Sequence, residues 1–153
     1  MTLAGRIEGL AERIETIASF ERLEETNLQE ARAAFEELKN GLNDGSIRAA
    51  EKESGRWVAR AWVKRGILLG FRLGALAPVE GGGFRFFDKD TFPLTRLSLA
   101  SGVRIVPGGT AVRDGCYVAP GVTIMPPAYI NVGAYVDSGS LIDSHALVGS
   151  CAQ

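Results

Sequence analysis

The residues from Val106 to Gln153 repeat with a period of six. Cut into sixes, they read VPGGTA, VRDGCY, VAPGVT, IMPPAY, INVGAY, VDSGSL, IDSHAL and VGSCAQ. Every block begins with Val or Ile, its fifth residue is small or compact, and Gly or Pro recurs in its middle. A period of six fits neither an α-helix nor a single flat strand. It therefore predicts a repeat architecture with one short strand and one turn per block.

We expect three blocks to form one triangular coil and successive coils to stack aliphatic side chains over one another. The branched first residue would point inward, and a glycine would permit a positive φ at the corner. Such repeats are similar to those of left-handed parallel β-helix proteins, an exception to the right-handed crossover rule. The alternative is an antiparallel meander with turns every six residues, but a meander would alternate apolar and polar positions more evenly.

The N-terminal half predicts a small helical domain. Apolar residues at three- and four-residue steps predict an amphipathic helix from residue 3 to about residue 20. A second helix is expected over residues 28–42, with Asn27 as its N-cap. The Asn-Asp-Gly-Ser stretch at 43–46 is expected to end this helix.

The next segments are less regular. Residues 47–53 are interpreted as a short strand, and a third helix is expected over residues 57–72, weakened by Gly66 and Gly70. Residues 78–93, with three consecutive glycines, are interpreted as a connector. The predicted organisation is an α+β chain: a helical domain over 1–76, a connector over 77–99 and the left-handed β-helix over 100–153.

Composition narrows the classes of function. The 153 residues carry a net charge of −1 with no block of like charges, so neither nucleic acid nor an anionic membrane is an expected partner. No apolar run reaches membrane-spanning length, and the first residues lack the apolar core of a signal peptide, which predicts a cytoplasmic protein. A buried thiol is expected at Cys116, and neither a disulfide framework nor a zinc site is expected with Cys151.

Three segments together resemble a known enzyme family. The run VRIVPGGTAVRDGCYVAPGVTIMPPAYINVGAYVDSGSLIDSHALVGSCAQ resembles the tetrahydrodipicolinate N-succinyltransferases of bacterial lysine biosynthesis. The earlier pieces RAAEKESGRWVARAWVKRGILLGFRL and FRFFDK resemble the N-terminal domain of that family. Members of the family continue past the equivalent of Gln153. We therefore expect the chain to hold only the first coils, to associate nonspecifically and to bind CoA weakly when alone.

The resemblance implies acyl transfer. Succinyl-CoA would be a co-substrate rather than a bound cofactor, and the acceptor would be the amino group of an acyclic, keto-bearing dicarboxylate derived from tetrahydrodipicolinate. The thioester is already activated, so the protein has to align amine and thioester, remove a proton and hold the acid groups still. The resemblance also implies a homotrimer, with each site shared between neighbouring coils.

Two residues match substrate-binding positions of the family. Arg104 corresponds to an arginine that grips a substrate carboxylate, and Asp143 to an acid that faces the substrate amine. The repeat places Asp143 beside the inward Ile142, so its side chain should point out of the coil, as should that of Asp137 one block earlier. A carboxylate is a weak base for an ammonium group, so Asp143 would mainly orient the amine. The family's second acidic residue lies beyond Gln153.

Other interpretations stay open at this point. His145, the single histidine, is expected to point outward in the block of Asp143, either as a surface residue or beside the site. A zinc site would need three histidines, which one chain lacks. The chain could also be a non-catalytic β-helix scaffold or inactive fragment, or belong to a sister N-acetyltransferase that uses acetyl-CoA.

Overall fold

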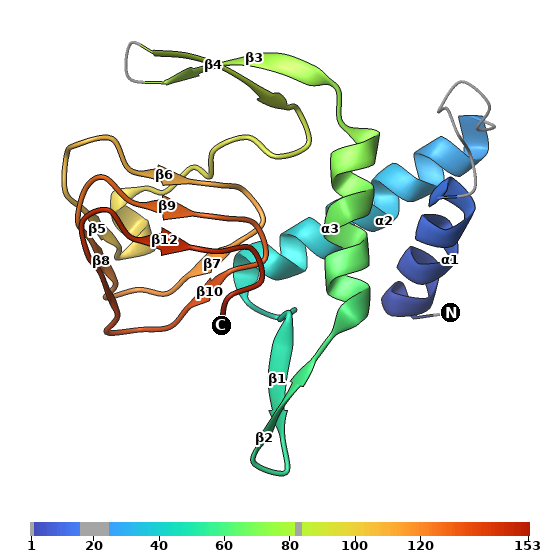
Figure 1. Ribbon diagram of the computed structural model, residues 1–153, viewed down its shortest axis with the longest axis horizontal. Helices are drawn as coiled ribbons and strands as arrows, with labels where there is room; N and C mark the ends of the chain where they lie inside the picture. Colours follow the sequence, from blue (N-terminus) through green and yellow to red (C-terminus); the bar gives the residue numbers. More distant parts are fainter. Residues whose placement is uncertain (1, 16–24, 82–83) are drawn as a thin grey trace.

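The computed structural model describes residues 2–15, 25–81 and 84–153 (Figure 1). Three helices lie on one side and a stack of short strands on the other. Two β-hairpins project from the molecule, one below the helices and one above the stack. The elements of the N-terminal part are α1 (Leu3–Glu15), α2 (Glu25–Asp44), β1 (Ala50–Glu53), β2 (Arg56–Ala59), α3 (Ala61–Leu73), β3 (Leu76–Gly81) and β4 (Phe84–Lys89). This arrangement confirms the predicted α+β class.

The three helices enclose one apolar core. Ile7 of α1, Leu38 of α2 and Ile67 of α3 are fully buried within it. The two glycines of α3 that lower its helix propensity face α2, and they let the helices approach closely. A Cβ atom at Gly66 would overlap Leu38, and one at Gly70 would overlap the ring of Phe35. The glycines therefore serve the packing of α3 against α2.

Replacing Gly70 with alanine is expected to lower the free energy of unfolding by about 1–3 kcal/mol, because the ring of Phe35 would have to move in a close-packed core. Gly9 of α1 is the matched control, since an added Cβ there meets no described residue within 4 Å. Gly9→Ala should stabilise the protein by up to about 1 kcal/mol. Urea unfolding of both variants measures the difference, and equal effects would contradict this packing.

The helical predictions are correct in their core and wrong at some ends. The first helix begins at Leu3 as predicted, and the part expected over residues 16–20 lies outside the described residues. Asn27 is not an N-cap, because it lies inside α2. This helix ends at Asp44 as expected, where Gly45 has a φ of +79° and the Asp44 carboxylate accepts a hydrogen bond from the Ser46 N–H at 2.8 Å.

The third predicted helix is present as α3 but begins later than expected, and its first predicted residues lie in a β-hairpin. Trp57 does not begin a helix: it lies in β2, which pairs antiparallel with β1. Ser54 and Gly55 both have positive φ values, 48° and 80°, which is the geometry of a two-residue hairpin turn. Likewise β3 and β4 pair antiparallel in continuous register, and all of their residues but Leu76 lie in the connector predicted over 77–99. The domain boundaries themselves stay a prediction.

The C-terminal part is a parallel β-helix. Its strands are β5 (Arg104–Ile105), β6 (Ala111–Val112), β7 (Tyr117–Val118), β8 (Thr123–Ile124), β9 (Tyr129–Ile130), β10 (Tyr135–Val136), β11 (Leu141–Ile142) and β12 (Leu147–Val148), preceded by the short 3-10 helix η2 (Leu99–Ser101). They form three faces, β5–β8–β11, β6–β9–β12 and β7–β10, and every pairing is parallel. The alternative of an antiparallel meander is therefore excluded.

Inward and outward positions alternate as the repeat predicts. The inward residues Ile124, Ile130 and Val136 are 5% exposed or less, and the compact residues Cys116 and Ala134 fill the corners beside them. Side chains at the preceding positions, such as Leu141 and Leu147, point out and are mostly exposed. The coil interior is thus a column of stacked aliphatic side chains.

The first coil departs from the predicted register. Ile105, not Val106, pairs with Ile124, so Val106 does not occupy the inward first position of a block. One extra residue lies in the turn between β5 and β6. Gly108 and Gly109 accommodate it with φ values of 146° and 90°. Consequently Arg104 lies in the first strand of the β-helix rather than before it.

One face of the β-helix is covered by the helical domain. The side chain of Asn43 in α2 donates to the Asp114 carboxylate at 2.7 Å and accepts from the Gly115 N–H at 2.8 Å. The Arg48 guanidinium stacks over the ring of Tyr135 at 3.6 Å. These contacts lie along the β7–β10 face, so the other two faces are the ones available for a site.

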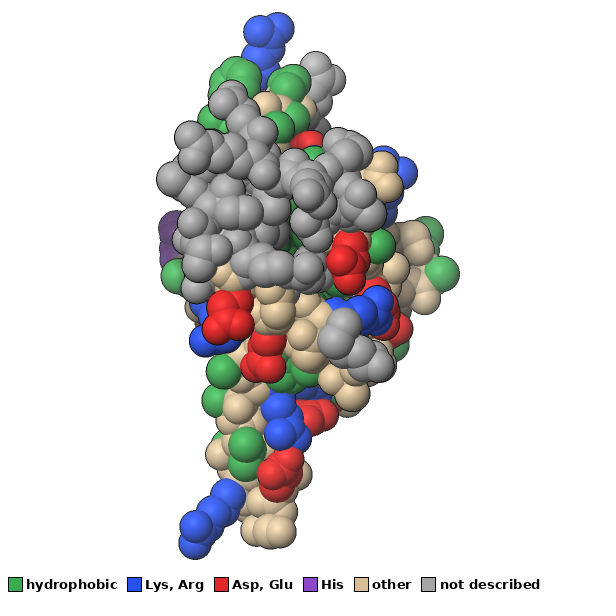
Figure 2. Space-filling view, turned by 90° about the vertical axis from the view of Figure 1, so that its right-hand side faces the viewer, with side chains coloured by type: hydrophobic (Ala, Val, Ile, Leu, Met, Phe, Trp, Pro, Cys, Tyr) green, Lys and Arg blue, Asp and Glu red, His purple; other side chains and the backbone are tan. Residues whose placement is uncertain are grey.

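Hydropathy and charge can be followed on the described residues. None of the helices in the described ranges is long and apolar enough to cross a membrane. The side of the molecule that carries the helices shows Lys and Arg side chains interspersed with Asp and Glu (Figure 2). Among the side chains that Figure 2 colours by type, positive charge does not gather into one patch on that side.

Candidate functional site

The β5–β8–β11 face brings Arg104 and Asp143 onto one surface. Arg104 pairs with Thr123 of β8, and Thr123 pairs with Leu141 of β11. Asp143 follows two residues after Leu141, and because side chains alternate along a strand, it points to the same outer side. Two steps between strands separate the two rows, roughly 10 Å at the usual spacing of parallel strands. The side chains of Thr123 and Met125 lie in the middle row between them.

The side chains of Arg104 and Asp143 are both exposed to solvent. The Arg104 backbone N–H donates to the Val122 carbonyl at 2.9 Å, but its guanidinium forms no hydrogen bond or ion pair with any residue in the described ranges. The Asp143 carboxylate accepts one hydrogen bond, from the N–H of Ser144 at 2.8 Å, which fixes its orientation and leaves its second oxygen available. The structure thus brings the two onto one face, which the described residues of this chain leave open to solvent.

Asp137 resembles Asp143 in local geometry and differs in location. Its carboxylate accepts the N–H of Ser138 at the same 2.8 Å, and it is also exposed. It follows β10, however, and lines a shallow pocket with Arg48 and Trp57 on the side of the helical domain. The face on which each acid lies, rather than its local bonding, therefore separates the two.

His145 has a structural reason for its position. It occupies the corner at which other blocks have glycine, and its φ is +62°, as at Gly139 with +75°. Its backbone N–H donates to the carbonyl of Pro127 at 2.7 Å, and its side chain is exposed. Histidine tolerates the left-handed region better than most residues. The corner geometry accounts for His145 as an outward residue of the coil.

The remaining titratable groups give little sign of nucleophilic or metal chemistry. Burial in the coil, with a smaller contribution from the Asp114 carboxylate, raises the pKa of Cys116 to about 12, so this thiol stays protonated. Cys116 and Cys151 are both free. Among the residues with described positions, no group of three or more His, Cys, Asp or Glu side chains could hold a metal ion.

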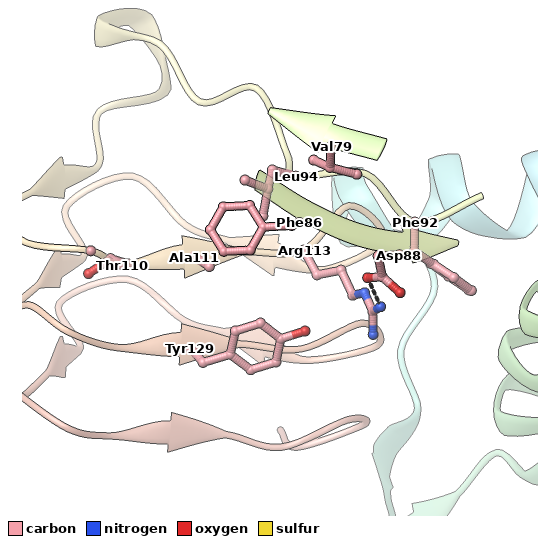
Figure 3. Close-up of a pocket in the computed structure, with 10 residues that line it drawn as sticks. Val79, Phe86, Asp88, Phe92, Leu94, Thr110, Ala111, Arg113 and Tyr129 are labelled. Carbon is pink, nitrogen blue, oxygen red and sulfur yellow. Dashed lines mark hydrogen bonds and ion pairs between the residues drawn. The ribbon is translucent and has the colours of Figure 1, made fainter. Parts of the chain in front are cut away.

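A cavity of about 460 Å³ lies on the β6–β9–β12 side, beneath the β3–β4 hairpin (Figure 3). Val79 and Phe86 of the hairpin form its roof, and Ala111 and Tyr129 form its floor. The sequence did not indicate this cavity. The alternation in FRFFDK places Phe86 and Asp88 on one face of a strand, but it does not show which surface that face covers.

Stacked hexapeptide coils joined to a helical domain define a hexapeptide-repeat β-helix protein, and comparison with known proteins narrows this class. Residues 9–73 match the family described as the N-terminal region of tetrahydrodipicolinate N-succinyltransferase. The chain is therefore related to the tetrahydrodipicolinate N-succinyltransferases, and the resemblance seen in the sequence is confirmed.

Individual relatives agree with this family. The chain is 44% identical over 88 residues to a 2,3,4,5-tetrahydropyridine-2,6-dicarboxylate N-succinyltransferase of Acinetobacter baumannii, an alignment that covers 55% of this chain and 32% of the relative. It is 41% identical over 86 residues to the protein of the same name from Acinetobacter baylyi, covering 54% and 32%. The chain thus spans about a third of the length of the curated relatives it matches.

Proposed function

We propose that the protein carrying this chain transfers the succinyl group of succinyl-CoA to the amino group of the acyclic dicarboxylate derived from tetrahydrodipicolinate. The observation that supports the proposal most is the shared face of Arg104 and Asp143. An unpaired arginine and an oriented carboxylate about two strands apart suit a molecule with a carboxylate at one end and an amine at the other.

The proposed division of roles follows from the chemistry of each group. The guanidinium of Arg104 binds a substrate carboxylate with two parallel N–H···O bonds. Asp143, held by the Ser144 N–H, accepts a hydrogen bond from the amine and directs its lone pair toward the thioester carbon. As the C–N bond forms, the amine loses a proton and CoA leaves as the thiol. Thr123 and Met125 lie under the chain that joins the two ends of the substrate.

The assembly and setting are proposed with the activity. The Arg104–Asp143 face lies open in a single chain, so we propose a homotrimer in which neighbouring subunits enclose it. We also propose that the enzyme acts in the cytoplasm, in lysine biosynthesis, with succinyl-CoA as a diffusible co-substrate. Binding of the dicarboxylate is the first step that can test this function.

Arg104→Ala is expected to raise the KM for the dicarboxylate about tenfold or more in the protein that carries this chain, because a charge-assisted bidentate contact is lost. Its kcat should change less, since the guanidinium binds ground state and transition state alike. Arg56→Ala, at an exposed arginine of the β1–β2 hairpin, is the control and should leave KM unchanged. Steady-state kinetics measures both, and an unchanged KM in Arg104→Ala would remove this residue from the site.

A further inference from the structure

The cavity beneath the β3–β4 hairpin is distinct from the Arg104–Asp143 face, because it lies on another side of the β-helix (Figure 3). Its volume of about 460 Å³ falls among pockets that hold small molecules, roughly 300–1,000 Å³. The hairpin and the coil wall it from opposite sides, with Phe86 above and Tyr129 below. A flat molecule inside would thus be covered on both faces.

One end of the cavity is polar but electrically neutral. Arg113 forms an ion pair with Asp88 of β4, and its side chain is only 11% exposed. The rings of Phe71 and Phe92 lie 5.0 and 5.5 Å from its guanidinium carbon. Since the two charges balance each other, a charged ligand would lose its hydration here without gaining a counter-charge. The cavity therefore favours an uncharged ligand.

Hydrogen-bonding capacity remains unused in the walls. Arg113 Nε and Thr110 Oγ1 are buried and have no hydrogen-bond partner among the residues that the structure describes. The hydroxyl of Tyr129 points toward the Arg113 end of the cavity (Figure 3). Buried polar groups are nearly always paired, so a donor left without an acceptor calls for one. At this end the Tyr129 hydroxyl can donate to an oxygen of a ligand. Arg113 Nε is buried and would reach that oxygen only after a shift of the guanidinium, and Thr110 lies at the opposite end of the cavity (Figure 3).

We propose that this cavity binds an uncharged, elongated small molecule with a flat apolar body and a carbonyl or amide oxygen at one end. The body lies between Phe86 and Tyr129, beside Val79 and Ala111. The oxygen lies at the end formed by Arg113 and the Tyr129 hydroxyl. This binding is independent of the proposed acyl transfer and does not require Arg104 or Asp143.

Titration of the protein that carries this chain with 4-phenylbutanamide, followed by amide chemical shifts, tests the proposal. Saturable shifts are expected around Val79, Ala111 and Tyr129, with a Kd on the order of 1 mM or lower for a molecule of this size. The matched probe 4-phenylbutylammonium has the same body but a charge and no acceptor. It should bind at least about tenfold more weakly.

Two variants locate the site. Ala111→Trp fills the cavity and should abolish saturation, whereas Leu147→Trp, outward on the same face but outside the cavity lining, should bind the amide as wild type does. Tyr129→Phe keeps the ring and loses the hydroxyl, so binding should weaken by about five- to tenfold.

Several results would overturn the proposal. The first is the absence of saturable shifts, and the second is equal affinity for the amide and the ammonium probe. The third is unchanged affinity for the amide in Tyr129→Phe. The Tyr129→Phe variant remains informative if Ala111→Trp fails to fold. A fourth result is a chemical-shift change at the same residues that increases with protein concentration when no amide is present. It would show that a second copy of the chain occupies the cavity, and it would also overturn the proposal.

Discussion

Asp143→Asn in the protein that carries this chain is expected to lower kcat by about 10²–10⁴-fold, with little change in KM for the dicarboxylate. The amide keeps the shape of the side chain and can keep the hydrogen bond from the Ser144 N–H, which is 2.8 Å long in the structure. The Asn side chain lacks the negative charge with which Asp143 stabilises the substrate amine while the amine loses a proton. Steady-state release of the CoA thiol measures the effect.

The chain offers a closely matched control for this substitution. Asp137 is exposed, accepts the following N–H at the same distance and belongs to the same repeat, but it lies on the side of the helical domain. Asp137→Asn should leave kcat unchanged, and His145→Ala should do little because His145 serves the corner of the coil. If kcat of the correctly folded Asp143→Asn variant decreases by less than about fivefold, the role proposed for this acid is contradicted.

Ile130→Ala is expected to lower the free energy of unfolding by about 2–5 kcal/mol. The Ile130 side chain is 0% exposed and lies in the aliphatic column between Val112 and Val148, its partners in the coils on either side. Its truncation leaves a cavity that the stacked coils cannot close without shifting their backbone hydrogen bonds. Urea unfolding, with the slope compared between variants, gives the change.

Leu147→Ala is the control for the inward and outward pattern. Leu147 belongs to the same face of the β-helix, but its side chain is 69% exposed. Its truncation should change the free energy of unfolding by no more than about 0.5 kcal/mol. Similar losses in the two variants would contradict the assignment of the Ile as inward and the Leu as outward.

The β-helix was predictable from its repeated sequence pattern. Features that depend on local backbone conformation were less predictable. Eight blocks with Val or Ile in one position allow few folds other than a β-helix. The register of the first coil was not predictable from that pattern, because the extra residue at Gly108–Gly109 is absorbed by backbone conformation. Likewise, the Ser54–Gly55 pair could precede a helix or form a hairpin turn, and only the pairing of β1 with β2 distinguishes these.

The candidate site was predictable in its residues but not in its geometry. The roles of Arg104 and Asp143 came from the resemblance alone, because an outward arginine or acid on a coil is usually a solvated residue. Their common face follows from the pairing of β5, β8 and β11, which depends on the first-coil register. The cavity was not predictable, because the β3–β4 hairpin reaches it from residues distant in sequence.

Release of the CoA thiol from succinyl-CoA tests most directly whether the Arg104–Asp143 face carries N-succinyl transfer. The assay uses the protein that carries this chain, with the dicarboxylate from tetrahydrodipicolinate as acceptor. We predict that thiol release requires both substrates, is faster with succinyl-CoA than with acetyl-CoA, and is lost in the folded Arg104→Ala, Asp143→Asn double variant. Release that is independent of the acceptor, or that persists unchanged in the double variant, would contradict the claim.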